Sequence, residues 1–210
     1  MSKYLADFNY LVMLVNLVLF LIRFKKLNRA LRIFTFYLFV IAIIQLTTRY
    51  FSRHNLNNLF LSHFYFVLQF VILSFFYKAI LPNSLQKKTI MTGVVLCFTI
   101  LAIQYYLDPS LFYTFNLLEI FITSFFILIY ALFHFYNILT ESKQYYYLNT
   151  GIFIYILGST VLFMSGDILS TIDKSFGKII YTLNGLLYIV YQVYIFIEWM
   201  RIRKEDATTL

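Results

Sequence analysis

Long apolar runs follow one another along almost the whole chain, and short polar stretches separate them. Seven of these runs have the roughly 20 residues that a helix needs to cross the hydrocarbon core of a bilayer. We predict these helices at 4–24, 31–50, 59–80, 89–107, 111–138, 146–169 and 178–200. The chain is therefore predicted to be a single transmembrane domain over residues 1–210, with no soluble domain.

A transmembrane β-barrel is the alternative architecture, and the pattern argues against it. Barrel strands alternate apolar and polar residues over segments of about ten residues. Here the apolar residues are continuous, as in 11–22 and 67–76. The chain is 61% hydrophobic and only 12% charged, whereas soluble domains are about 25% charged. We expect an all-α polytopic membrane helix bundle.

Basic residues alternate between the two ends of the predicted helices. Twelve of the 17 Lys and Arg residues fall at one set of ends, which the positive-inside rule makes cytoplasmic. These are Arg23, Lys25, Lys26, Arg29, Arg32, Lys78, Lys87, Lys88, Lys143, Arg201, Arg203 and Lys204. We expect the N-terminus outside and the C-terminus in the cytoplasm of a bacterial inner membrane. Contact with anionic lipid heads accounts for the net charge of +8, so no nucleic-acid partner is expected.

No sequence motif of a known catalytic, cofactor or metal site is present. The chain lacks C-x-x-C, H-E-x-x-H, G-x-S-x-G and G-x-x-x-x-G-K-[ST] patterns. The single cysteine, Cys97, lies inside the fourth predicted helix and cannot form an internal disulfide. We therefore expect no cofactor and no metal.

Polar residues recur on one side of the fifth predicted helix. Their spacings of 3, 4, 7, 4 and 3 residues place them on a single helix face. The stripe consists of Asn116, Glu119, Thr123, Tyr130, His134 and Asn137. Interhelical hydrogen bonding is one explanation for such a face, because polar side chains link helices in membranes. A face that lines a binding site is the other.

Glu119 is the most informative residue of this stripe. On the predicted boundaries it lies eight residues into its helix, roughly 12 Å along the axis. A carboxylate at that depth must be protonated, paired with a cation or reached by water. His63, four residues into the third predicted helix from the same outer side, is the expected partner.

Other polar residues also fall toward the outer ends of their predicted helices. Together they predict a polar cavity that opens to the exterior and suits a ligand arriving from outside. The candidate ligand-binding residues are His63, Asn116, Glu119, Asn184, Gln45 and Tyr188. A buried structural network around Glu119, without a ligand, is the alternative.

Small residues repeat every seven positions in the sixth predicted helix, at Gly151, Gly158 and Ser165. Small side chains let two helix backbones approach closely. The repeat predicts a packing seam against a neighbouring helix, and a homodimer interface is the alternative.

Two segments resemble known sequences. HFYFVLQFVILSFFY (63–77) and NTGIFIYILGSTVLFMSGDIL (149–169) are similar to stretches of small, uncharacterised seven-helix membrane proteins of Bacteroidota, which are often encoded beside two-component histidine kinases. The similar segments cover about a sixth of the chain and carry no diagnostic chemical motif. The resemblance implies a detached membrane sensor that signals through a histidine kinase.

Two functions from different classes are consistent with the sequence. The first is a sensory or ligand-binding module that acts through a separate kinase or other output protein. The second is a membrane-embedded lipid hydrolase similar to the small lysoplasmalogenases, with His63 and Glu119 as its acid–base pair. Hydrolysis usually relies on paired carboxylates or an activated nucleophile, and this chain offers a single intramembrane carboxylate. We therefore do not expect an enzyme. A proton-coupled transporter with Glu119 as its proton site is a third function.

Overall fold

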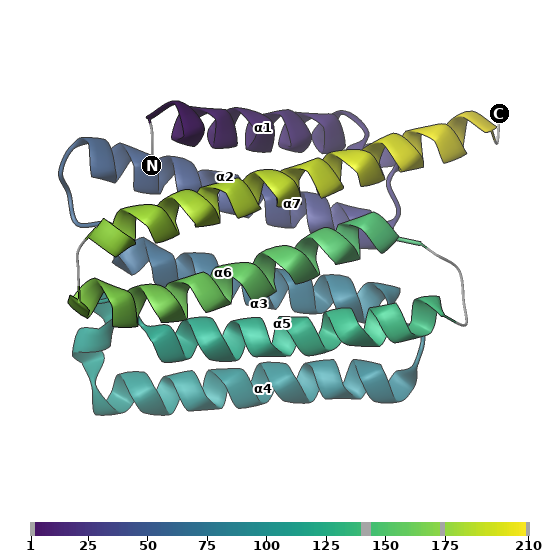
Figure 1. The fold of residues 1–210 in the computed structure, drawn as a ribbon. Helices are drawn as coiled ribbons and strands as arrows, with labels where there is room; N and C mark the ends of the chain where they lie inside the picture. Colours follow the sequence, from purple (N-terminus) through teal and green to yellow (C-terminus); the bar gives the residue numbers. More distant parts are fainter. Residues whose placement is uncertain (1–2, 140–143, 173–174, 209–210) are drawn as a thin grey trace. The chain divides into compact units, whose positions relative to one another are not determined.

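The computed structural model describes residues 3–139, 144–172 and 175–208, and every long element in these ranges is an α-helix. The helices are α1 (Lys3–Ile22), α2 (Arg29–Arg53), α3 (Phe60–Ile80), α4 (Ser84–Leu107), α5 (Leu117–Ile138), α6 (Tyr146–Ile172) and α7 (Ser175–Thr208) (Figure 1). Two short 3-10 helices, η1 (Phe24–Lys26) and η2 (Pro109–Tyr113), lie in connections. All seven long helices are long and apolar enough to cross a membrane, which confirms the seven predicted from the sequence.

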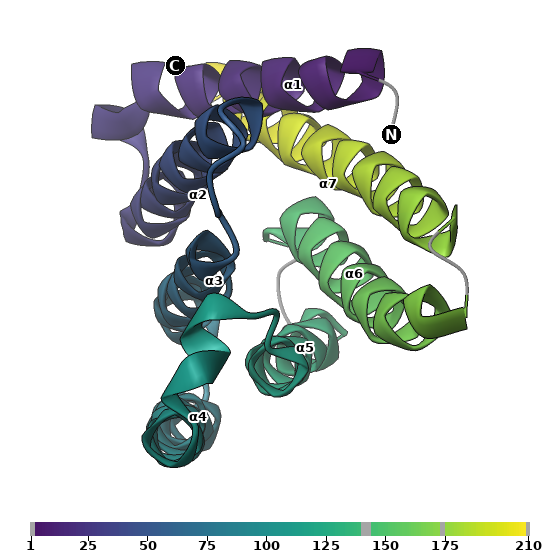
Figure 2. The same cartoon turned by 90° about the vertical axis from the view of Figure 1, so that its left-hand side faces the viewer.

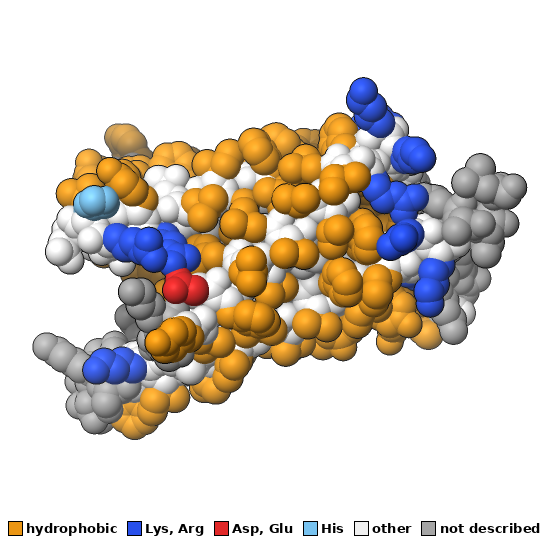
Figure 3. Space-filling view, turned by 90° about the horizontal axis from the view of Figure 1, so that it is seen from above, with side chains coloured by type: hydrophobic (Ala, Val, Ile, Leu, Met, Phe, Trp, Pro, Cys, Tyr) orange, Lys and Arg blue, Asp and Glu red, His pale blue; other side chains and the backbone are white. Residues whose placement is uncertain are grey.

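The described surface has the character expected of a lipid-facing protein. Hydrophobic side chains cover most of the face in Figure 3, and the Lys and Arg side chains lie near helix ends. Helix α4 alone exposes Val95, Leu96, Phe98 and Ile103. In water such a surface would drive aggregation, so these features are those of a multi-pass membrane protein. Of the basic residues counted above, Lys143 lies outside the described residues.

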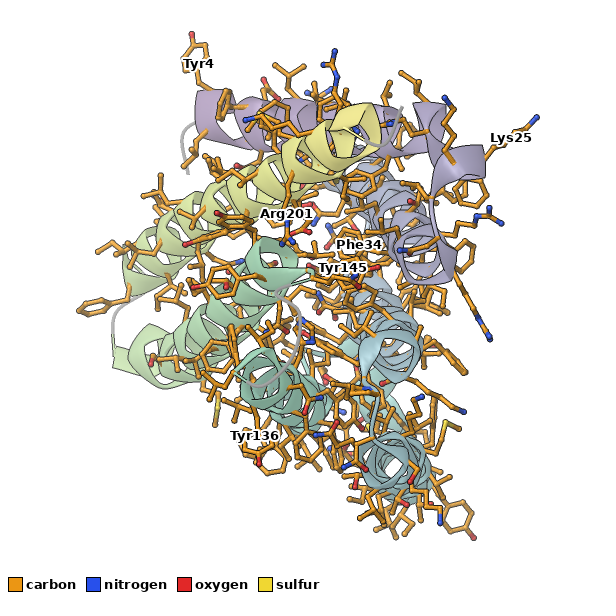
Figure 4. All side chains as sticks on the ribbon, turned by 90° about the vertical axis from the view of Figure 1, so that its right-hand side faces the viewer. Tyr4, Lys25, Phe34, Tyr136, Tyr145 and Arg201 are labelled. Atoms are coloured by element: carbon orange, nitrogen blue, oxygen red, sulfur yellow. The ribbon has the colours of Figure 1, made fainter. Side chains whose placement is uncertain are left out.

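One compact unit runs from residue 24 to residue 134 and holds α2, α3, α4 and most of α5. Helix α3 packs between α2 and α4 in this unit (Figure 2). Its core is aromatic, with Phe34, Phe70 and Tyr77 completely buried. Figure 4 shows Lys25, in the connection before α2, pointing away from the helices. Burial of the large rings on one side of α2 and α3 fixes how these two helices pack.

The second unit contains α1, α6 and α7. Glycines bring α6 and α7 together, because a Cβ atom added to Gly151 would lie 2.7 Å from Tyr194 Cβ. A Cβ atom on Gly158 would lie 2.6 Å from Leu187 Cδ2. The predicted seam therefore faces α7 at both glycines. Ser165 is half-buried, and the homodimer alternative stays a prediction.

Helices α1 and α7 are joined by a ladder of polar contacts. Asn9 Nδ2 donates to the carbonyl oxygen of Gly185 (3.1 Å), and Asn16 Nδ2 donates to both the carbonyl oxygen and Oε1 of Gln192 (2.8 Å each). Both pairs are separated by 176 residues, so the two helices run in the same direction, as Figure 1 also shows. Asn9 and Asn16, one heptad apart, therefore both lie on the face of α1 that contacts the parallel helix α7.

The predicted start of the fifth helix, at residue 111, is wrong. Helix α5 begins at Leu117, after η2, and Asn116 caps it by accepting a hydrogen bond from the backbone N–H of Glu119 (3.2 Å). Glu119 is therefore the third residue of its helix, and the predicted depth of eight residues is also wrong. Helix α4 ends before Pro109, because proline has no backbone N–H with which to continue the helix. The η2 turn follows, and Asp108 Oδ1 caps it by accepting a hydrogen bond from the backbone N–H of Ser110 (3.1 Å).

Candidate functional site

The first turns of α3 and α5 bring His63 and Glu119 into contact. His63 Nδ1 lies 3.1 Å from Glu119 Oε1. His63 is 5% exposed and Glu119 is 1% exposed, so the pair is shielded from solvent. The partnership that the sequence predicted is confirmed. A carboxylate in an apolar setting is stable only with such partners.

Tyr105, in the last turn of α4, completes a triad with these two residues. Its hydroxyl donates to Glu119 Oε2 (2.6 Å) and lies 2.9 Å from His63 Nδ1. The two carboxylate oxygens therefore face different partners, one imidazole and one phenol. Sequence reasoning missed Tyr105, because it is one of 19 tyrosines and no periodic pattern singles it out.

A pair of amide side chains, Gln104 and Asn116, is hydrogen-bonded to the triad. Gln104 Nε2 donates to Asn116 Oδ1 (3.1 Å), and Asn116 Nδ2 donates to Gln104 Oε1 (3.0 Å) and to the Tyr105 hydroxyl (3.3 Å). Asn116 thus joins the end of α4 to the start of α5. We call His63, Gln104, Tyr105, Asn116 and Glu119 the His63 cluster.

The sequence contains a signal for part of this arrangement. Asn116 and Glu119 form an N-x-x-E pattern just before a hydrophobic run, and this pattern is the signature of a helix N-terminus. Here Asn116 is the cap residue and Glu119 is in the first turn. The carboxylate turns toward His63 and Tyr105, so the pattern supports a site as well as a helix start.

Among the described residues, the second nitrogen of the imidazole has no hydrogen-bond partner. His63 Nε2 is buried, and no described residue forms a hydrogen bond with it. Since an ionised carboxylate only accepts hydrogen bonds, we place a proton on Nδ1, which leaves Nε2 as the available atom. An imidazole oriented by a carboxylate at one nitrogen commonly uses the other to contact a ligand or to exchange a proton.

The remaining predicted site residues do not join the cluster in the described contacts. Gln45 is half-buried on α2, and within the described ranges it makes no hydrogen bond to a cluster member. Asn184 and Tyr188 belong to α7, in the other unit, so their part in a common cavity stays a prediction. Tyr188 packs edge-on against Tyr155, with 5.5 Å between ring centroids.

The rest of the α5 stripe is buried, as its spacing predicted. Thr123 and Tyr130 are at most 1% exposed. The Thr123 hydroxyl donates to the carbonyl oxygen of Glu119 (2.7 Å), and the Tyr130 hydroxyl donates to that of Ile90 (3.2 Å). Both side chains are satisfied by backbone groups, so we assign them a structural role.

The described residues bring no group of three His, Cys, Asp or Glu side chains together that could hold a metal ion. No protein-family model, curated protein or solved structure matches the chain. Its function must therefore be argued from the His63 cluster itself.

Proposed function

We propose that the protein is a membrane-embedded sensory module that binds a ligand at the His63 cluster. The observation that carries this proposal is the buried, unpartnered His63 Nε2 beside the buried carboxylate of Glu119. A purely structural network would be expected to satisfy both nitrogens, because an unpaired polar atom in an apolar interior costs free energy. A ligand that bonds to Nε2 removes this cost.

The orientation that we propose has the N-terminus outside and the C-terminus in the cytoplasm of a bacterial inner membrane. Two observations support it. The basic residues Lys25, Lys26 and Arg29 gather at the end of α1 and the start of α2, and positive charge is retained in the cytoplasm. Parallel α1 and α7 are what a chain with an odd number of crossings needs. The His63 cluster, at the first turns of α3 and α5 and the last turn of α4, then lies in the outer half of the membrane.

Reporter fusions should bear out this orientation. A reporter fused after Leu210 should be active in the cytoplasm, and one inserted at Asn55, an exposed residue between α2 and α3, should be active only outside. The measurement is paired alkaline phosphatase and green fluorescent protein activity in intact cells. Cytoplasmic activity at Asn55 would contradict the proposed topology.

A separate protein would carry the output of this module. Helices that can span a membrane take up nearly all of the described residues, which leaves no described domain for an output reaction. We propose a membrane histidine kinase as this partner, which is what the resemblance suggested for segments 63–77 and 149–169 would imply.

Glu119→Gln tests the sensory function without knowledge of the ligand. The amide keeps the size of the side chain but removes the charge that orients His63, so cells with this variant should show the transcript changes of a deletion strain. The measurement is the transcript profile of the deletion strain complemented with each variant, at matched protein levels. His54→Gln is the control, since His54 is exposed at the end of α2. Full complementation by Glu119→Gln would contradict the proposal.

Lipid hydrolysis is the second candidate function, and the geometry of the pair favours it over transport. A carboxylate that orients Nδ1 and a free Nε2 is the arrangement of a general base. Purified protein should then cleave lysolipids, and Glu119→Gln should abolish the cleavage. Absence of cleavage by the parent protein would leave the sensory function as the better supported one.

A further inference from the structure

Aromatic rings in contact with one another lead from the surface of the unit that holds α2, α3 and α4 to the His63 ring. Phe112 on η2 stacks on His63, with 5.4 Å between centroids and 22° between ring planes. Phe64 lies edge-on to Phe112 at 6.3 Å and is 46% exposed. One ring, that of Phe112, therefore separates the buried imidazole from a phenylalanine on the apolar surface. A ligand reaching His63 along this path would contact hydrocarbon and aromatic groups.

Among the described residues, the His63 cluster offers a ligand one buried polar atom. His63 Nε2 is the buried cluster atom without a hydrogen-bond partner among the described residues. The other polar atoms that face the triad are engaged with one another, at Glu119, Tyr105 and Asn116. A ligand that fits has a single polar group and an apolar body, which is the composition of a simple amphiphile.

The charge of the cluster indicates which polar head group a ligand can carry. The described hydrogen bonds of the cluster include a carboxylate and no Lys or Arg, so an anionic head group would be repelled by Glu119. An ammonium head group would lose its hydration without gaining the Glu119 carboxylate as a direct partner, because His63 and Tyr105 occupy its two oxygens. A hydroxyl is neutral, donates to Nε2 when that atom is unprotonated and accepts when it is protonated.

Resting on the function proposed above, we propose that the ligand is an amphiphilic alcohol that enters from the bilayer. Its hydroxyl bonds to His63 Nε2, and its hydrocarbon chain lies along Phe112 and Phe64. The η2 connection, which carries Phe112, links α4 to α5, and both helices contribute to the cluster. A ligand beside Phe112 would therefore contact the η2 connection. Gln104 and Asn116, which flank this connection, are hydrogen-bonded to each other.

Nitrogen NMR of the histidines tests this proposal directly. The chain has three histidines, so ¹⁵N-histidine labelling gives a simple spectrum, and His63→Gln and His54→Gln assign it. The full chain is placed in phosphatidylcholine nanodiscs, since this lipid carries no hydroxyl. 1-Decanol, decanoate and decylammonium are then titrated at equal mole fractions. These probes share one chain and differ in head group.

We expect 1-decanol to shift the His63 Nε2 resonance saturably and to leave His54 unchanged. Decanoate and decylammonium should bind at least tenfold more weakly. Phe64→Ala should weaken decanol binding several-fold, whereas Phe125→Ala should not, although Phe125 is similarly exposed at 48% on α5. Equal effects of the two alanine variants would overturn the proposed path of the chain.

Absence of a saturable shift with 1-decanol, or stronger binding of either charged probe, would overturn the alcohol as the ligand class. This outcome is separable from the function itself. If 1-decanol gives no saturable shift while Glu119→Gln still has the transcript profile of a deletion strain, the sensory function remains supported and only the alcohol ligand class is rejected. If both results are negative, the cluster is structural and both proposals fall.

Discussion

Replacing His63 with leucine should destabilise the protein by about 1–3 kcal/mol, the usual cost of leaving a buried polar group without its hydrogen-bond partner. Leucine has no polar atom, so Glu119 would lose the group that lies 3.1 Å from Oε1 and would keep only the Tyr105 hydroxyl at Oε2. The measurement is the free energy of unfolding in mixed micelles titrated with sodium dodecyl sulfate.

The double variant His63→Leu/Glu119→Leu distinguishes a stranded charge from lost packing. Removing both partners leaves no uncompensated carboxylate, and the Tyr105 hydroxyl keeps the hydrogen bond from Asn116 Nδ2, so the double variant should be more stable than His63→Leu alone. His54→Gln, at an exposed position, should change stability by less than about 0.5 kcal/mol. Additive losses in the double variant would show that the two side chains are not energetically coupled.

Gly151→Ala should destabilise the protein by about 1–3 kcal/mol, the usual cost of overpacking a well-packed interface. The new Cβ atom would lie 2.7 Å from Tyr194 Cβ. A Cβ atom is fixed to the backbone, so Tyr194 cannot rotate away and α6 must separate from α7. The same unfolding assay measures the loss.

Gly177→Ala is the matched control for this change. Gly177 lies in the first turn of α7, and nothing comes within 4 Å of the position of an added Cβ atom. Alanine favours helix over glycine by up to about 1 kcal/mol, so this variant should be neutral or more stable. Similar losses at both glycines would show that helix propensity, and not the seam, decides the effect.

The pairing of His63 with Glu119 followed from an energetic argument that needs no structure. A carboxylate among apolar residues requires a partner, and few residues in this chain could supply one. The same argument predicts too deep a position for Glu119, because residues 111–115 are mostly apolar and continue the helical pattern. The cap at Asn116 overrides hydropathy there, since its side chain satisfies a backbone N–H that begins the helix.

Tyr105 and Gln104 show the limit of reading one helix at a time. Each lies in the last turn of α4, and their roles depend on which atoms of α3 and α5 come within 3.3 Å of them. Tyrosine and glutamine near a helix end are ordinary at a membrane interface. Their sequence context therefore contains no signal of the hydrogen bonds that they form.

The sequence alone suffices to predict the seven apolar helices found among the described residues, because continuous apolar segments in a bilayer must satisfy their backbone groups internally. It also determined which faces are polar or small, since helical spacing depends only on local geometry. The tertiary structure alone decided which helices meet. The Gly151 seam faces α7, Asn16 pairs with Gln192, and His63 keeps Nε2 unpartnered. Lipid solvates apolar faces equally well, so hydropathy does not select neighbours, and packing and directional hydrogen bonds do.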